Sequence, residues 1–227
     1  MSYPKTIVCL ANSRKLSGRC VAGREITISG FGKWIRPVSA RATQEISVEE
    51  QMTQDLCGTS ILDVVTITMR SPLPQNYQTE NHLIDDRIAW MKQQRIGWDN
   101  LQNAIENPRG PLWWNGYSSS KGHNDRVPEY YANSLGRSLY LIRPENLTLV
   151  FGFEDSRRRL RARFDLCGHH YHLAVTDPWA ESRYLAGDGD ETRLDDALLC
   201  ISLGEIYKDS CAYKLVAAVI TPQRAVV

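Results

Sequence analysis

The sequence predicts a mainly β protein in which two small β-barrels follow one another along the chain, joined by a helical and loop segment. Short β-branched runs separated by glycine-bearing turns fill the first third of the 227 residues. The pattern changes to helical spacing near residue 85, and strand-like runs return from residue 138 onward. We therefore expect a first barrel over 1–76, a helical and aromatic-rich connector over 77–137, and a second barrel over 138–227.

The first barrel is predicted from four short strands. Each strand is rich in Val, Ile or Thr, and the turns between them (LSGR, GFGK and LCGTS) contain glycine. Four or five such strands in so short a segment fit a small closed barrel better than an open sandwich. The predicted strands are KTIVCLA (5–11), REITIS (24–29), KWIRPVS (33–39) and LDVVTITM (62–69).

The connector is predicted to begin with a helix over 85–106. Asp85 or Asp86 can cap its start, Gly97 is expected to interrupt it, and Pro108 is expected to end it. The rest of the connector is rich in Gly, Ser, Asn and aromatic residues without periodicity, which predicts an ordered loop. The apolar positions of the expected helix are Ile88, Met91, Ile96, Leu101 and Ile105.

The second barrel contains a hairpin whose register can be worked out from the sequence. In RRRLRARFDLCGHHYHLAVTDP (157–178), alternating runs flank Cys167-Gly168, which suits a two-residue turn. Such a turn pairs Phe164 with Tyr171 and places nearly all the large apolar residues on one face of the sheet. The opposite, polar face then carries Arg161, Arg163, His170 and His172. The other strands expected in this barrel are SLYLIRP, LTLVFGF, ALLCISL and YKLVAAVI.

The polar face of this hairpin has three possible interpretations. Long cationic side chains on a barrel wall can follow a phosphate backbone. They can also be solvated charges that protect a sheet edge from aggregation. A metal site has the right atom types, but Cys167 and His169 lie at the turn and no second ligand cluster appears elsewhere. We favour the polyanion interpretation, and expect neither a metal nor another cofactor.

Two N-terminal stretches carry further candidate residues. LANSRKLSGRC (10–20) begins where a strand ends and predicts a polar loop that could surround a phosphate, with Gly18 allowing close backbone approach. In GFGKWIRP (30–37), Trp34 is either a stacking surface for a base or a core residue, and Arg36 on the same strand face would hold a phosphate. The candidate binding residues in these stretches are Asn12, Ser13, Arg14, Lys15, Arg19, Lys33, Trp34 and Arg36.

These stretches make the chain resemble the prokaryotic dual OB-domain family. The similarity lies in IVCLANSRKLSGRCVAG, GKWIRPVS, YQTENHLID, YHLAVTDP, CISLGE and YKLVAAVI, which together span nearly the whole chain. It implies two OB folds in tandem, a context of bacterial phage defence, and recognition of nucleic acid or nucleotides, without a known catalytic activity. The residues that match its motifs are Asn12, Ser13, Arg14, Lys15, Gly18, Arg19, Cys20, Trp34, Arg36, Pro37, Thr176, Asp177 and Pro178.

Charge and composition indicate where such a protein works. The net charge is only +1, but residues 1–41 hold eight Lys or Arg and one acid, a local charge of +7. The six cysteines form no C-x-x-C pair, which is typical of reduced thiols in a cytosolic protein. We find no signal-peptide pattern at the N-terminus, and the longest apolar run, LVAAVI (215–220), is too short to span a bilayer. We therefore expect a cytoplasmic protein without a membrane partner.

The leading hypothesis is a non-catalytic protein that binds single-stranded nucleic acid or RNA, with an effector protein of the same system as a possible partner. No nucleophile–base pair, metal cage or nucleotide-binding motif is recognisable. An alternative is a sensor that holds one nucleotide or nucleotide-derived signal in the Asn12–Arg19 stretch. A less favoured alternative is a metal-dependent hydrolase using His170, His172, Asp165 and Asp177, although Asp177 before Pro178 is more typical of a turn cap.

Overall fold

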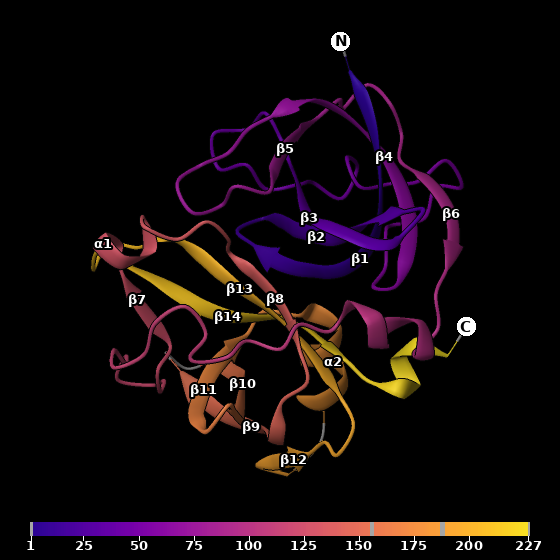
Figure 1. Cartoon of the computed structure of the whole chain (residues 1–227). Coiled ribbons are helices and arrows are strands. Elements are labelled where there is room, and N and C mark those ends of the chain that lie inside the picture. Colours follow the sequence, from indigo (N-terminus) through magenta and orange to yellow (C-terminus); the bar gives the residue numbers. More distant parts are fainter. Residues whose placement is uncertain (1, 155–156, 187–188, 227) are drawn as a thin grey trace. The chain divides into compact units, whose positions relative to one another are not determined.

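The chain folds into two compact units, each built around its own β-sheet (Figure 1). The computed structural model describes residues 2–154, 157–186 and 189–226. The first unit contains Met1–Ala104 and Pro222–Val227, and the second contains Ile105–Thr221. The predicted connector over 77–137 is thus divided between the two units. In the ranges that the structure describes, we find no helix long and apolar enough to cross a membrane.

The first unit is a closed five-stranded barrel. Its strand order is β1-β2-β3-β5-β4, and β4 pairs back with β1. All neighbouring strands are antiparallel except β3 and β5, which are parallel. β6 adds to the outer edge of β4. The elements are β1 (Tyr3–Lys15), β2 (Gly18–Thr27), β3 (Gly30–Val38), β4 (Asp63–Pro72), β5 (Asn81–Ile84), β6 (Met91–Arg95) and the 3-10 helices η1 (Asp99–Ala104) and η2 (Pro222–Ala225).

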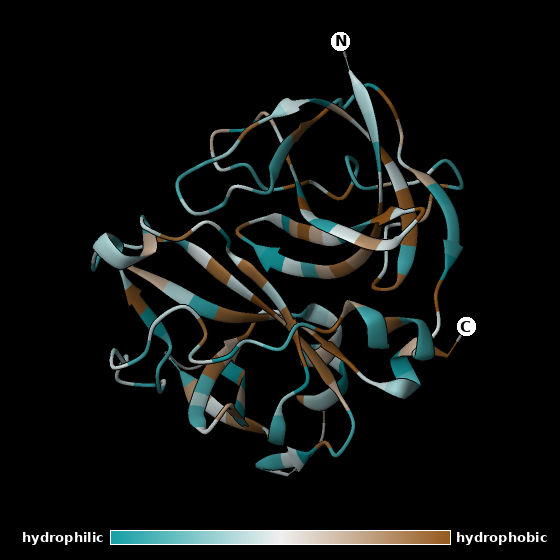
Figure 2. Ribbon diagram, viewed as in Figure 1, coloured by the Kyte–Doolittle hydropathy of each residue, from teal (hydrophilic) through white to brown (hydrophobic). Residues whose placement is uncertain are grey.

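A long first strand closes this barrel. The first half of β1 pairs with β4, its second half pairs with β2, and a bulge between Cys9 and Ala11 lies in the β1–β2 pairing. Val65, Ile67 and Met69 alternate along β4 and are fully buried, so one face of the strand forms the core. Many of the hydrophobic bands in Figure 2 fall on these strands. The four strands predicted in this third of the chain are confirmed.

The second unit repeats the same topology with an interrupted first strand. Its order is β9-β10-β11-β14-β13-β8, and its third and fifth barrel strands, β11 and β14, are again parallel. β12 lies beside β9 and β7 beside β14. The elements are β7 (Arg126–Pro128), α1 (Glu129–Ala132), β8 (Leu139–Ile142), β9 (Glu145–Glu154), β10 (Arg157–Leu166), β11 (His169–Val175), α2 (Pro178–Tyr184), β12 (Glu191–Arg193), β13 (Leu198–Ile206) and β14 (Cys211–Ile220).

β8 and β9 together take the place of β1 in this second barrel. β8 pairs with β13 and β9 pairs with β10, as the two halves of β1 pair with β4 and β2. Only Arg143 and Pro144 separate them, and Pro144 has no N–H to continue a ladder. Both units therefore have the strand order of an OB fold, a small Greek-key barrel, and the predicted fold class is confirmed.

The helix predicted over 85–106 is wrong. The segment instead forms β6 and η1, with turns between them. Ile88 and Met91, two of its expected apolar positions, are 45% and 50% exposed, whereas Trp90 is buried. The apolar residues had mixed spacings, so no single helix face could bury them, and pairing with β4 draws the segment onto the sheet instead. The rest of the predicted connector contains β5, β7 and α1, which we did not expect.

Candidate nucleic-acid interface

The β10–β11 hairpin has the register that the sequence predicts. Phe164 pairs with Tyr171 and Arg163 with His172. The turn residues Cys167 and Gly168 both have positive φ, 51° and 75°, as a two-residue hairpin turn with the twist of the strands requires. The buried face belongs to the core of the second unit and contains Leu160, Ala162, Phe164, Leu166, Tyr171, Leu173 and Val175.

The outer face of this hairpin carries the four predicted residues, and three of them have a carboxylate partner. Arg161 Nε lies 2.6 Å from Glu154 Oε1, and Arg163 Nη2 lies 3.0 Å from Glu191 Oε2. His170 Nδ1 pairs with Asp165 across the hairpin. Arg161, through its hydrogen bond, holds the pKa of Glu154 below its usual value. The face is therefore an alternating array of both charges, not a uniformly positive stripe.

His172 lies half-buried, directly opposite Arg163 on the neighbouring strand. Burial lowers its pKa, and the positive charges of Arg161 and Arg163 lower it further, so the imidazole is neutral near pH 7. Its backbone exchanges two hydrogen bonds with His123, at 3.1 and 3.0 Å. Within the described residues, His172 Nε2 and Arg161 Nη1 are buried without a hydrogen-bond partner. These two side chains thus keep unused hydrogen-bonding capacity, which makes their rearrangement toward a ligand less costly.

The equivalent strands of the first barrel present an arginine beside a tryptophan. Arg24 and Trp34 are directly opposite in the β2–β3 register, next to the pair Gly23 and Ile35. Ile35 is in the core, so the alternation of the strands places Arg24 and Trp34 on the outer face. The Arg24 guanidinium lies 5.8 Å from the centre of the Trp34 ring. Trp34 is partly exposed and is not a core residue, and the neighbouring Lys33 is exposed.

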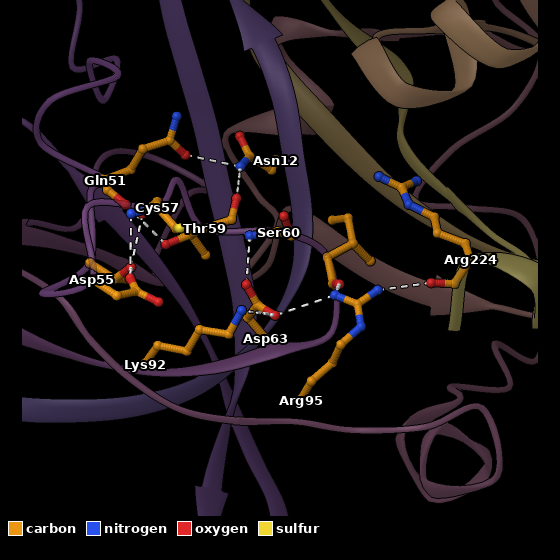
Figure 3. Close-up of polar contacts among 12 residues, drawn as sticks. Asn12, Gln51, Asp55, Cys57, Thr59, Ser60, Asp63, Lys92, Arg95 and Arg224 are labelled. Carbon is orange, nitrogen blue, oxygen red and sulfur yellow. Dashed lines mark hydrogen bonds and ion pairs between the residues drawn. The ribbon is translucent and has the colours of Figure 1, made fainter. Parts of the chain in front are cut away.

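The polar loop predicted over residues 12–19 is wrong. β1 continues to Lys15 and β2 begins at Gly18, so the stretch is a hairpin. Asn12 Nδ2 donates to Gln51 Oε1 at 2.9 Å and to the Thr59 carbonyl at 2.6 Å (Figure 3). Ser13 is buried, and its hydroxyl donates to the Cys20 carbonyl. A phosphate site formed by Asn12 and Ser13 does not fit, because the donor groups of both side chains are already hydrogen-bonded within the first barrel.

Gly18 serves the packing of the first barrel. A Cβ at this position would lie 2.5 Å from the Ile46 carbonyl oxygen, and Arg19 pairs through its backbone with the same residue. The close approach that we expected for a phosphate is therefore made by the chain itself. Arg14, Lys15 and Arg19 remain candidate contacts at the end of the hairpin, with Arg14 exposed and directly opposite Arg19.

Arg36, which we expected to contact a ligand, instead lies in a buried ion pair. Its side chain is 5% exposed and forms an ion pair with Glu80 at 3.1 Å, while its backbone N–H donates to the Glu80 carbonyl at 2.8 Å. The Arg36 guanidinium therefore cannot bind a phosphate unless its buried ion pair with Glu80 breaks. The structural reason is the parallel pairing of β3 with β5, which brings the Glu80 backbone beside Arg36.

A second buried acid in the first unit is Asp63, at the start of β4. Its carboxylate accepts from the Ser60 N–H at 2.9 Å and lies 3.1 Å from Lys92 Nζ and 3.3 Å from Arg95 Nη1. Arg95 in turn donates to the Arg224 carbonyl at 2.8 Å (Figure 3). This network ties β6 and η2 to the barrel. The sequence offered no signal for it, because its members are far apart in the chain.

The structure gives no support to a metal centre. Among the residues that it describes, no group of three or more His, Cys, Asp or Glu side chains could hold an ion. Asp177, a member of the hypothetical hydrolase site, is the N-cap of α2 and accepts from the Trp179 N–H at 3.1 Å. Its other carboxylate oxygen accepts from the Val219 N–H at 2.9 Å. The expected cap is confirmed, which leaves this carboxylate unavailable for hydrolysis.

Comparison with known protein families agrees with this topology. A model of the dual OB-containing domain matches residues 5–219, nearly the whole chain. The chain belongs to this family. OB folds commonly bind oligonucleotides through the face of their second and third strands, and in this dual OB protein those strands are β2 and β3 in one barrel and β10 and β11 in the other.

One curated protein shares a limited stretch with this dual OB protein. Photosystem I P700 chlorophyll a apoprotein A2 of Stigeoclonium helveticum is 29% identical over 119 residues. The stretch covers 52% of this chain but only 15% of the length of that protein, so we draw no functional argument from it. No solved structure matches the chain.

Proposed function

We propose that this dual OB protein binds single-stranded nucleic acid or RNA, without catalysing a reaction, through the outer faces of β2–β3 and β10–β11. The observation that carries the proposal is the confirmed hairpin register. It places Arg161, Arg163, His170 and His172 on the strands by which OB folds hold their ligands. The nature of the side chains supports the same conclusion, since guanidinium groups bind phosphates in a bidentate manner.

Nucleic acid that binds to the second barrel would replace the carboxylate partners of Arg161 and Arg163 with phosphates. The Arg163–Glu191 pair is more than half exposed on both sides, so water already weakens it, and a phosphate can replace the carboxylate at low cost. Arg161 is less exposed and would follow only when its pair with Glu154 opens. A ligand must displace these carboxylates to bind the arginines. A polyanion with several phosphates can do so more readily than a single nucleotide, because it forms several ion pairs at once.

Binding to the first barrel would rely on stacking. Trp34 has an exposed portion beside Arg24, and an aromatic ring next to a cation can stack on a base while the cation binds a flanking phosphate. The alternative of a single-nucleotide pocket between Asn12 and Arg19 loses its basis, because Asn12 and Ser13 bond within the barrel. The family resemblance supports a further proposal, a role in bacterial defence alongside an effector protein. The cysteine pattern supports a cytoplasmic location for that role.

The salt dependence of binding tests this function. Fluorescence anisotropy with a labelled single-stranded DNA or RNA oligomer gives the slope of log Kd against log salt for the wild type and for the Arg161→Ala/Arg163→Ala double variant. We expect weaker binding to all sequences and a slope lower by about two, because each arginine removed leaves about one phosphate without its cation. Arg183→Ala is the matched control, because Arg183 is exposed on α2, whose Ala180 packs into the core.

Two results would contradict the proposal. The first is an absence of binding to any DNA or RNA oligomer at low salt. The second is a double variant whose slope equals that of the wild type and of Arg183→Ala, which would show that the hairpin face does not touch the phosphates.

A further inference from the structure

The second unit contains an open pocket that belongs to neither OB face. Its volume is about 560 Å³, and it lies where β7 and α1 meet the turn between β13 and β14. The backbone holds this place together, since Pro128 pairs with Cys211 and the Glu129 N–H donates to the Ser210 carbonyl at 2.9 Å. The lining residues are Tyr117, Pro128, Glu129, Tyr130, Asn133, Asp209, Ser210 and Cys211.

The pocket presents tyrosine rings that are held in place from behind. Tyr130 is 64% exposed, and its hydroxyl is 3.0 Å from that of Tyr117. The Tyr130 ring lies 4.3 Å from that of Tyr131, which in turn stacks on Trp114 at 4.1 Å and 18°. Three rings in series make a rigid platform, so a flat group that stacks on Tyr130 loses little freedom in the protein.

The charge of the pocket is negative. Its titratable lining includes the carboxylates of Glu129 and Asp209, and no Lys or Arg is found among the described lining residues. Hydrogen bonds from Tyr213 and Arg126 hold the pKa of Asp209 below its usual value, which keeps this carboxylate charged. Arg126 offsets part of the charge of Asp209, while the carboxylate of Glu129 is exposed and adds a charge that water partly screens. A phosphate group would be repelled here.

We propose that this pocket binds an arginine side chain presented by a partner protein. A guanidinium is planar and cationic, so it can stack on the face of Tyr130 while its N–H groups donate to a carboxylate. Arginine fits better than lysine, because the platform is flat and an ammonium gains less from stacking. None of the lining residues lies in β2, β3, β10 or β11, so the pocket is not formed by the strands proposed to hold nucleic acid.

Titration with a small peptide tests the pocket directly. The probe is acetyl-Gly-Gly-Arg-Gly-Gly-amide, followed by changes in the NMR spectrum of the full-length protein. The matched probe replaces arginine by citrulline, which keeps the shape and removes the charge. We expect the arginine peptide to shift the signals of Tyr117, Tyr130 and Glu129 and the citrulline peptide to bind at least about tenfold more weakly.

Single variants separate the contribution of the Tyr130 ring from that of the Glu129 carboxylate. Glu129→Gln and Tyr130→Ala should each weaken the arginine peptide about threefold or more, whereas Tyr130→Phe, which keeps the ring, should bind like the wild type. Glu145→Gln and Phe153→Ala change exposed residues of the same unit outside the pocket and should have no effect. Equal binding of the citrulline peptide, or adenosine binding that is lost in Tyr130→Ala, would overturn the proposal. Wild-type binding of the arginine peptide by both Glu129→Gln and Tyr130→Ala would overturn it too.

Discussion

Lys214 is fully buried in the second unit and donates a hydrogen bond from its ammonium group to Oδ1 of Asn115 at 2.8 Å. It also donates to the Trp114 carbonyl and lies 5.2 Å from the centre of the Tyr171 ring. Lys214 therefore holds the segment that carries the Trp114 ring, the base of the aromatic platform, against β14. Burial lowers its pKa to about 7, with Asp125 acting in the opposite direction.

This burial predicts a pH dependence of stability. In the unfolded chain the pKa of a lysine is about 10.4, so between pH 7 and 10 the unfolded state binds more protons than the folded state. The contribution of Lys214 to the free energy of unfolding therefore increases as the pH rises through this window, and its full cost is present below pH 7. Relative to Lys214→Met, the wild type should gain about 1.4 kcal/mol per pH unit between pH 7.5 and 9. Urea unfolding at several pH values measures this difference, and parallel curves for the two proteins would contradict it.

Breaking the Arg36–Glu80 pair should destabilise the first unit. Arg36→Ala leaves Glu80 buried without its partner, and we expect a loss of about 3–5 kcal/mol in the free energy of unfolding. The double variant Arg36→Met/Glu80→Leu should recover most of it, since no unpaired charge remains. Arg41→Ala is the control, because the Arg41–Glu50 pair is longer, at 3.6 Å, and more exposed. An Arg36→Ala protein as stable as Arg41→Ala would contradict the structural role.

The two hydrogen bonds of Asp177 predict a second stability effect. Asp177→Ala removes the cap of α2 and leaves the buried Val219 N–H without an acceptor, so we expect a loss of about 2–4 kcal/mol. Asp177→Asn keeps one carbonyl oxygen and should lose less. Chemical denaturation followed by circular dichroism gives both values. An Asp177→Ala protein within about 0.5 kcal/mol of the wild type would show that the cap contributes little.

Trp34 should contribute to binding without being needed for folding. Because its ring is partly exposed, we expect Trp34→Ala to keep its β-sheet spectrum and melting temperature nearly unchanged. Loss of stacking on a base should weaken oligonucleotide binding by about 1–3 kcal/mol, and Trp34→Phe should restore part of it. A Trp34→Ala protein that unfolds would place this residue in the core after all. A folded variant with wild-type affinity would place the nucleic acid elsewhere.

Local pattern explains which parts of the fold could be predicted from the sequence. The β10–β11 hairpin is defined by one turn and an alternation of period two, and a shift of one residue would expose Phe164 and Tyr171. The parallel pairs β3–β5 and β11–β14 have no such signal, since their partners are joined by long crossovers. The burial of Arg36 depends on one of these crossovers, so its strand alone suggested a surface residue.

The same distinction applies to the functional candidates. The outer-face residues of β10–β11 follow from the alternation, whereas their acidic partners Glu154 and Glu191 lie on other strands. Lys214 stands within an apolar run, a pattern that could have signalled a buried charge, but nothing local indicates Asn115 as its acceptor. The segment that carries Tyr117 and Tyr130 has no periodicity in its sequence, so its folding into a pocket could not be expected.

The return of η2 to the first unit affects how the protein is made. A ribosome releases the chain from its N-terminal end, so Arg95 emerges long before Arg224, whose carbonyl it binds. All of Ile105–Thr221 must be synthesised in between. The strands of each barrel are consecutive in the chain and can pair as soon as they appear. The contact between Arg95 and Arg224 differs, because the first unit can form it only after the whole second unit has been synthesised.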